Sequence, residues 1–127
     1  MTDTNESRLS TVLSRAARAA EILDELKMDE VTVLDLRDVT DFTDFFILAT
    51  ARSNAQMKAA VHRVVDGLKL VGLRPFTPPE DESPKWSVID YGDFVVHLFE
   101  EDARRHYCLE ELWGDAAELD WRQEATA

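Results

Sequence analysis

Residues 86–99, WSVIDYGDFVVHLF, decide the fold of this chain. Valine, isoleucine, phenylalanine and tryptophan alternate with other residues on both sides of Tyr91-Gly92, which is typical of two strands joined by a tight turn. Gly92 can adopt the positive φ that two-residue hairpin loops need. The stretch therefore predicts a β-hairpin whose loop is Tyr91-Gly92.

In that hairpin Asp90 faces Asp93 and Trp86 faces His97, and facing residues share one side of the ribbon. The apolar side, which we expect to face the core, carries Ser87, Ile89, Phe94, Val96 and Leu98. The mixed side carries Trp86, Val88, Asp90, Asp93, Val95, His97 and Phe99. Two opposed carboxylates disfavour pairing, and a cationic partner would relieve the repulsion. Alternatively, both acids simply lie in water at a turn.

The composition limits the class of protein. The length of 127 residues indicates one domain, and 26 acidic against 14 basic residues give a formal net charge of -12. Such a chain disfavours unaided binding to nucleic-acid phosphates or an anionic membrane, and favours basic protein surfaces. The single cysteine, Cys108, excludes an internal disulfide. With no signal peptide pattern at the start and no apolar run of about 20 residues, we expect a soluble cytoplasmic protein.

The first half of the chain predicts two helices and two strands. An amphipathic helix is expected over residues 7–26, after a disordered tail at 1–6, and strands over 31–36 and 44–50. The second strand is apolar on both faces and should be central. Ser53 and Gln56 form a capping box for a second helix, which Gly72 should end. This helix is long enough to connect parallel strands.

The second half adds an edge and a helix. Residues 73–77 predict a short edge strand, because Pro75 cannot donate to a ladder, and 78–84 an exposed acidic loop. Asp102 is expected to cap a last helix ending at Gly114. Its larger apolar residues are Tyr107, Leu109, Leu112 and Trp113. We therefore predict a single α/β domain over 7–114, with a mixed sheet of about five strands flanked by helices, and a C-terminal tail at 115–127 pinned in part by Trp121.

No pattern predicts a metal or cofactor. His62, His97, His106 and Cys108 lack ligand spacing, and Cys108 has no visible activating partner. The turn 50–53 could bind an anion through free amides, unless Ser53 satisfies them. Two of the acids at strand ends could hold a divalent cation for nucleotidyl transfer, although the glycine-serine turn and the closely spaced acid pair are missing. These acids are Asp35, Asp44, Asp90 and Asp93.

Four blocks in order resemble the ribosomal silencing factor family, RsfS, also called Iojap. They are residues 43–47 (TDFFI), 50–56 (TARSNAQ), 86–99 and 104–116 (RRHYCLEELWGDA). Each block is weak alone, but the four together are specific and cover roughly residues 9–116. The chain departs from the family pattern at Ala51, where glycine is usual, and at Phe45, where tyrosine is common.

The resemblance implies a nucleotidyltransferase-like fold without the catalytic set, and a protein that is not an enzyme. Its members bind a basic protein, ribosomal protein fourteen, on the joining face of the large ribosomal subunit. They block the small subunit sterically, repress translation when nutrients are short, and are commonly homodimers when free. In agreement with the acidic composition, we expect no membrane partner and no direct sequence-specific nucleic-acid binding. The alternatives are a metal-dependent nucleotidyltransferase and a dimeric adaptor for another basic protein.

We expect the mixed side of the hairpin to contact this partner. Trp86 is the expected main contact, because aromatic residues dominate interface energetics. Asp90 and Asp93 would accept charge-assisted hydrogen bonds, and Tyr91 at the turn tip would be a second contact. His97 would orient Trp86 or contact the partner. Trp86 could instead pack in the core, and His97 could be a satisfied structural histidine.

Overall fold

The computed structural model describes residues 4–76, 85–107, 114 and 116–122. Its elements are α1 (Thr4–Glu25), β1 (Asp29–Asp35), β2 (Phe45–Ala51), α2 (Asn54–Lys69), β3 (Trp86–Asp90), β4 (Phe94–Glu100), α3 (Glu101–Tyr107) and β5 (Ala117–Leu119).

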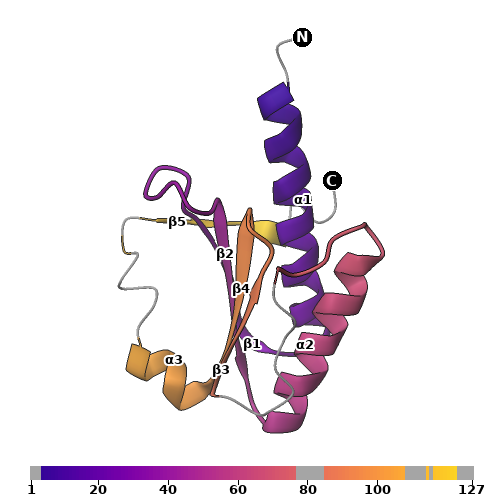
Figure 1. Cartoon of the computed structure of the whole chain (residues 1–127). Coiled ribbons are helices and arrows are strands. Elements are labelled where there is room, and N and C mark those ends of the chain that lie inside the picture. The colour runs from indigo at the N-terminus through magenta and orange to yellow at the C-terminus, as the bar shows by residue number, and fades with distance from the viewer. Residues whose placement is uncertain (1–3, 77–84, 108–113, 115, 123–127) are drawn as a thin grey trace.

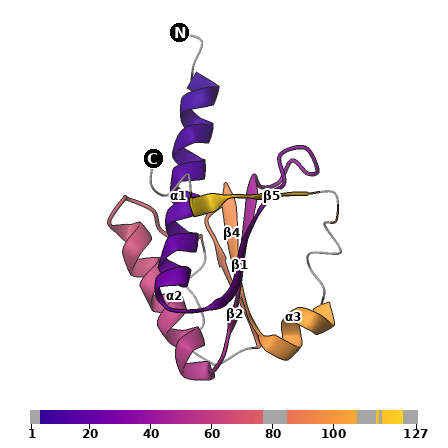
Figure 2. The same cartoon turned by 180° about the vertical axis from the view of Figure 1, so that it is seen from behind.

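The strands form one mixed sheet in the order β3-β4-β2-β1-β5. Only the central pair, β2 and β4, is parallel, and the other neighbours are antiparallel. Helices α1 and α2 lie side by side on one face, called here the inner face, whereas α3 lies at one end of the opposite, outer face (Figures 1 and 2). The predicted fold class, a mixed α/β sheet of five strands flanked by helices, is confirmed.

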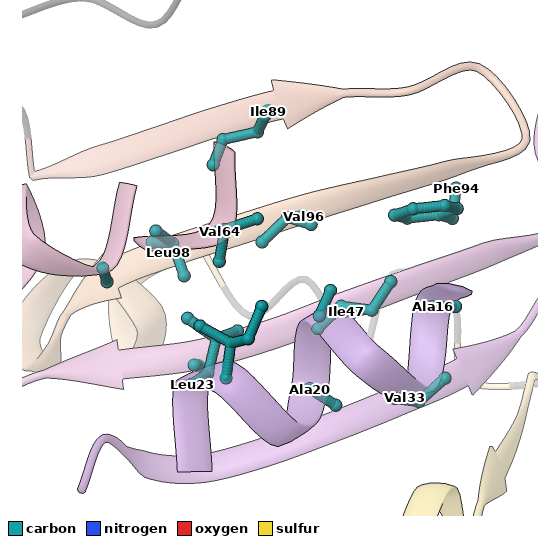
Figure 3. Packing of buried hydrophobic residues seen from close by; sticks show 14 of the residues in the cluster. Ala16, Ala20, Leu23, Val33, Ile47, Val64, Ile89, Phe94, Val96 and Leu98 are labelled. Carbon is teal, nitrogen blue, oxygen red and sulfur yellow. The ribbon is translucent and has the colours of Figure 1, made fainter. Parts of the chain in front are cut away.

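The main core lies between the inner face and the two long helices. Small residues of α1, Ala16 and Ala20, let its backbone approach the sheet closely, and Leu23 fills the space beside them (Figure 3). Ile47 of β2 and Val96 of β4 meet them from the sheet (Figure 3). Every residue of β2 is buried, which confirms that it is a central strand. Strand β4 pairs with β2 and lies between it and the edge strand β3.

The connection from β2 to the hairpin begins as predicted. Ser53 is the N-cap of α2 and its hydroxyl accepts a hydrogen bond of 3.0 Å from the amide of Gln56. The side chain of Gln56 reaches back one residue further than in a standard capping box, to the amide of Arg52 at 2.6 Å. Gly72, at φ +85°, follows the helix end. The crossover leads to β3 at the sheet edge, and β4 then returns parallel to β2.

Arg104 fastens α3 to the sheet. Its side chain is buried, and its guanidinium donates to the carbonyl of Glu30 at 2.8 Å and to the hydroxyl of Thr50 at 3.0 Å. The backbone of Glu30 has a positive φ of 52°, within an irregular part of β1. Helix α3 is thereby held at the end of the outer face that lies furthest from the hairpin turn (Figure 1).

Several predicted bounds differ from the structure. Residues 73–76 are not a strand; Pro75 has no amide, and only the amide of Phe76 bonds to β3, at Asp90. The fifth strand is instead β5, in the segment predicted to be a tail, where Trp121 is buried against the main core as expected. Helix α1 starts at Thr4, so residues 4–6 are helical.

Helix α3 starts at Glu101, which places Asp102 in its first turn rather than at its cap. Four predicted features lie outside the described residues. These are tail residues 1–3, loop 78–84, the predicted helix residues Cys108, Leu109, Leu112 and Trp113, and tail residues 123–127.

Candidate functional site

The hairpin register differs from the prediction by two residues. Trp86 pairs with Phe99 and Asp90 with Val95, and the amide of Tyr91 bonds to the carbonyl of Phe94 at 3.0 Å. The loop is therefore Gly92-Asp93, and the predicted Tyr91-Gly92 loop is wrong. The physical reason is that the first loop residue of a primed turn needs a positive φ, which Gly92 adopts at 83° and a tyrosine disfavours.

The two faces of the hairpin survive this correction. Side chains alternate with a period of two, so a shift of two residues leaves each of them on its predicted side. The outer face carries Trp86, Val88, Asp90, Val95, His97 and Phe99, without Asp93, which lies in the turn. The predicted apolar side packs in the main core through Ile89, Phe94, Val96 and Leu98.

Trp86 is held in place by His97. The indole Nε1–H donates a hydrogen bond of 3.0 Å to Nδ1 of His97, and the indole stacks on Phe99 with 5.2 Å between ring centroids. Trp86 is half-buried against the outer cluster of the sheet. It therefore packs in part within the domain and in part presents its ring at the surface, with a fixed orientation.

His97 is a structural support. It is 6% exposed, its edge-on neighbour Phe46 is 4.5 Å away between centroids, and burial lowers its pKa to about 4. The ring is thus neutral near pH 7, and since Nδ1 accepts from Trp86, the proton is on Nε2. This Nε2–H is buried and has no hydrogen-bond partner among the described residues. The expectation that His97 orients Trp86 agrees with this geometry, but from a diagonal position, because its facing residue is Val88.

Tyr91 is not at the turn tip. It lies on the inner face, 6% exposed, and stacks on Phe94 with 5.1 Å between centroids. Burial raises the pKa of its phenol to about 12. The predicted position of Tyr91, exposed at the turn tip, is therefore wrong, and the cause is the register, which moves Tyr91 out of the two-residue loop to the position directly before it.

Asp90 and Asp93 have different positions. The Oδ1 of half-buried Asp90 accepts a hydrogen bond of 2.8 Å from the amide of Gly92, which forms the turn. Asp93 is exposed, and its carbonyl accepts a bond of 2.9 Å from the amide of Asp44. The two carboxylates do not face each other across the ribbon, so the predicted repulsion between opposed acids does not arise.

Acidic residues gather at the end of the sheet where the hairpin turns. The loop 36–44 and the turn 91–93 both lie at the upper end in Figure 1. This acidic end comprises Asp38, Asp41, Asp44, Asp90 and Asp93. Asp35, at the same end, is paired with Arg37 at 2.6 Å, and that guanidinium lowers the pKa of the carboxyl. Hence the sheet end has an excess of negative charge beyond the two acids predicted from the hairpin.

The sequence did not predict that the acidic end also carries an exposed aromatic residue, Phe42. Phe42 is 63% exposed and meets Phe46 edge-on at 6.4 Å between centroids. Phe46 in turn packs on His97. The available signal was a lone phenylalanine in a polar connection, directly before one of the family blocks.

The alternative chemistries find little support in the described residues. Within them, no group of three or more His, Cys, Asp or Glu side chains is placed to hold a metal ion. Asp35, a residue of the enzyme hypothesis, is engaged by Arg37. At the turn 50–53, Ser53 and Gln56 accept from two of the amides that an anion would need. No helix in the described ranges has the length and apolar character to cross a membrane.

Comparison with known proteins defines the class as a regulatory protein of the ribosome. The family model for the ribosomal silencing factor during starvation, RsfS, matches residues 10–127. RsfS of Halalkalibacterium halodurans is 34% identical over 98 residues, covering 77% of this chain and 84% of the relative. RsfS of Haemophilus influenzae is 33% identical over 93 residues, covering 73% and 91%. The chain belongs to the ribosomal silencing factor family, which confirms the resemblance of the four sequence blocks.

Solved structures agree. A crystal structure from Chromobacterium violaceum matches with a TM-score of 0.71 at 36% identity, covering 76% of this chain and 80% of that one. A second, from Bacillus halodurans, matches with a TM-score of 0.69 at 29% identity, covering 80% and 92%.

Proposed function

We propose that this protein silences ribosomes by binding a basic protein, ribosomal protein fourteen, on the joining face of the large subunit. Bound there, it prevents the small subunit from docking by occupying its space, and so represses translation when nutrients are short. Family membership supports the ribosomal role. The observation that carries the contact surface is the outer face of the hairpin, where half-buried Trp86 is held in a fixed orientation at the start of β3 and the acidic end lies at the turn.

Three predicted contact residues remain in position to meet a partner. Trp86 presents an orientated aromatic ring at the surface, and Asp93 is exposed. Asp90 uses Oδ1 for the turn, but a carboxylate has about four acceptor sites, so it can also receive a partner's cationic donor. Because Tyr91 and His97 are buried, we assign them supporting roles: Tyr91 supports the turn from below and His97 fixes the indole.

The charge of the chain favours this kind of partner. A net charge of -12 attracts a basic surface and disfavours direct contact with ribosomal RNA, so recognition falls to a protein. Opposite charges of this kind accelerate association and make it sensitive to salt. Blocking the small subunit by occupying its space needs no catalytic group.

We further propose that the free protein is a homodimer in the cytoplasm, as the resemblance implies.

Cosedimentation tests the proposal. The protein is mixed with cognate large subunits, with small subunits and with joined ribosomes, and the bound fraction is measured after centrifugation. We expect binding to large subunits only. Trp86→Ala and Asp93→Asn should weaken it, whereas Leu70→Ala, a substitution of an exposed apolar residue at the end of α2, should not. Equal binding to joined ribosomes, or no binding to large subunits, would overturn the proposal.

A further inference from the structure

We infer that Phe42 is a second aromatic contact, which receives an arginine side chain of the same basic partner. This inference rests on the proposed function and extends its surface from the hairpin to the loop 36–44. Large apolar side chains that are exposed are few among the described residues. They are Phe42, Leu70, Val71, Phe76 and Val88. Of these, Phe42 is connected by ring contacts to the side chain that fixes Trp86.

A continuous row of rings joins the two contacts. Phe42 meets Phe46 at 6.4 Å, Phe46 meets His97 at 4.5 Å, and His97 accepts the hydrogen bond from Trp86. The two middle members are 4% and 6% exposed, so they are fixed by packing, while the two end members reach the surface. Phe42 and Trp86 are therefore held on the outer face at a defined separation, as two contacts for one partner need to be.

The charge around Phe42 selects the chemistry of the partner. The hydrogen bond from the amide of Asp44 to the carbonyl of Asp93 ties the loop 36–44 to the hairpin turn. Phe42 therefore belongs to the same acidic end as the turn. A guanidinium is the cation that suits an exposed ring among carboxylates, because it stacks on the ring face and also binds a carboxylate with two parallel hydrogen bonds.

The same end of the sheet already contains this arrangement within the chain. The guanidinium of Arg37 lies 5.3 Å from the ring centroid of Phe45 and donates to both oxygens of Asp35, at 2.9 Å and 2.6 Å. The partner's arginine would repeat on Phe42 what Arg37 does on Phe45. This favours an arginine over a lysine, whose ammonium cannot make the planar, two-pronged contact.

The test measures the affinity of purified cognate large subunits for fluorescently labelled protein. Phe42→Ala should raise the Kd about fivefold to thirtyfold, the range of a partly desolvated cation–π contact. Phe42→Leu keeps apolar volume but removes the ring, so it should raise the Kd nearly as much as Phe42→Ala does. Phe42→Trp keeps an aromatic ring and should bind as tightly as wild type or more tightly. Leu70→Ala is the matched control, because it removes an exposed apolar side chain away from the outer face.

The outcomes separate this inference from the proposed function. If wild-type protein binds, Trp86→Ala weakens binding, and both Phe42→Ala and Phe42→Leu stay within about twofold of wild type, the inference is wrong and the proposed function stands. If Phe42→Leu binds as well as wild type while Phe42→Ala does not, the contact is apolar and no arginine is stacked there. If wild-type protein itself fails to bind, both proposals fall. Circular dichroism of each variant verifies that the fold is intact.

Discussion

The buried position of His97 gives a quantitative prediction for stability against pH. In the folded protein burial lowers the pKa of His97 to about 4, whereas the unfolded chain has the ordinary value of 6.5. As the pH falls through this window the unfolded state binds the proton first, so stability is lost between about pH 6.5 and pH 4. From pH 7.5 to pH 5 this linkage amounts to about 2 kcal/mol, or a melting temperature lower by about 7 °C.

The comparison is made with His97→Gln, which does not titrate and whose side-chain carbonyl can still accept from the indole of Trp86. Urea unfolding at pH 7.5, 6 and 5 should show wild type losing about 2 kcal/mol more than the variant. Arginine partners lower the pKa values of Asp29 and Asp35, so the stability that these two carboxylates contribute is lost only at lower pH. That loss is the same in both proteins and does not affect the comparison. If the two proteins lost stability in parallel, His97 would be solvated and available to a partner, and the supporting role assigned to it would be wrong.

Three further substitutions test the geometry of the hairpin and its supports, each by urea unfolding at pH 7.5. Gly92→Ala places a residue with a Cβ at a positive φ, and that Cβ would lie 2.6 Å from the ring of Phe76. It should therefore cost more stability than Gly72→Ala, which has a similar φ but no neighbouring atom and should cost about 1 kcal/mol. Equal costs for the two variants would show that the ring of Phe76 moves aside. Asp90→Ala should cost about 1 to 2 kcal/mol more than Asp90→Asn, which keeps an acceptor for the amide of Gly92; no difference would contradict the turn bond. Arg104→Met should cost about 2 to 4 kcal/mol, since it leaves the carbonyl of Glu30 and the hydroxyl of Thr50 without this donor; a near-neutral result would mean that α3 is held by other contacts.

The parts of the fold that local chemistry determines could be predicted from the sequence. The apolar run of β2 and the Ser53 cap of α2 each follow from neighbouring residues, and both are confirmed. The faces of the hairpin were also predictable, because alternation tolerates a shift of two residues. The loop was not, since choosing it required weighing the φ of Tyr91 against that of Gly92.

Long-range packing accounts for the other differences. Three residues, Ala117–Leu119, have no periodicity of their own, and they become β5 only because β1 has an edge to pair with. The burial of His97 depends on Phe46, which is distant in sequence, and the burial of Tyr91 depends on helices that cover the inner face. Phe42 is joined to the outer face by its contact with Phe46, which no local pattern predicts.

The most direct test of silencing by occupancy is the rate and extent of subunit joining, followed by light scattering. Large subunits are preincubated with wild-type protein, with Trp86→Ala or with the double variant Asp90→Asn/Asp93→Asn, and small subunits are then added. We expect wild-type protein to reduce the joined fraction in proportion to its occupancy of large subunits, and both variants to restore joining at the same concentration. Unchanged joining at saturating wild-type protein would contradict the proposal that this chain blocks the small subunit.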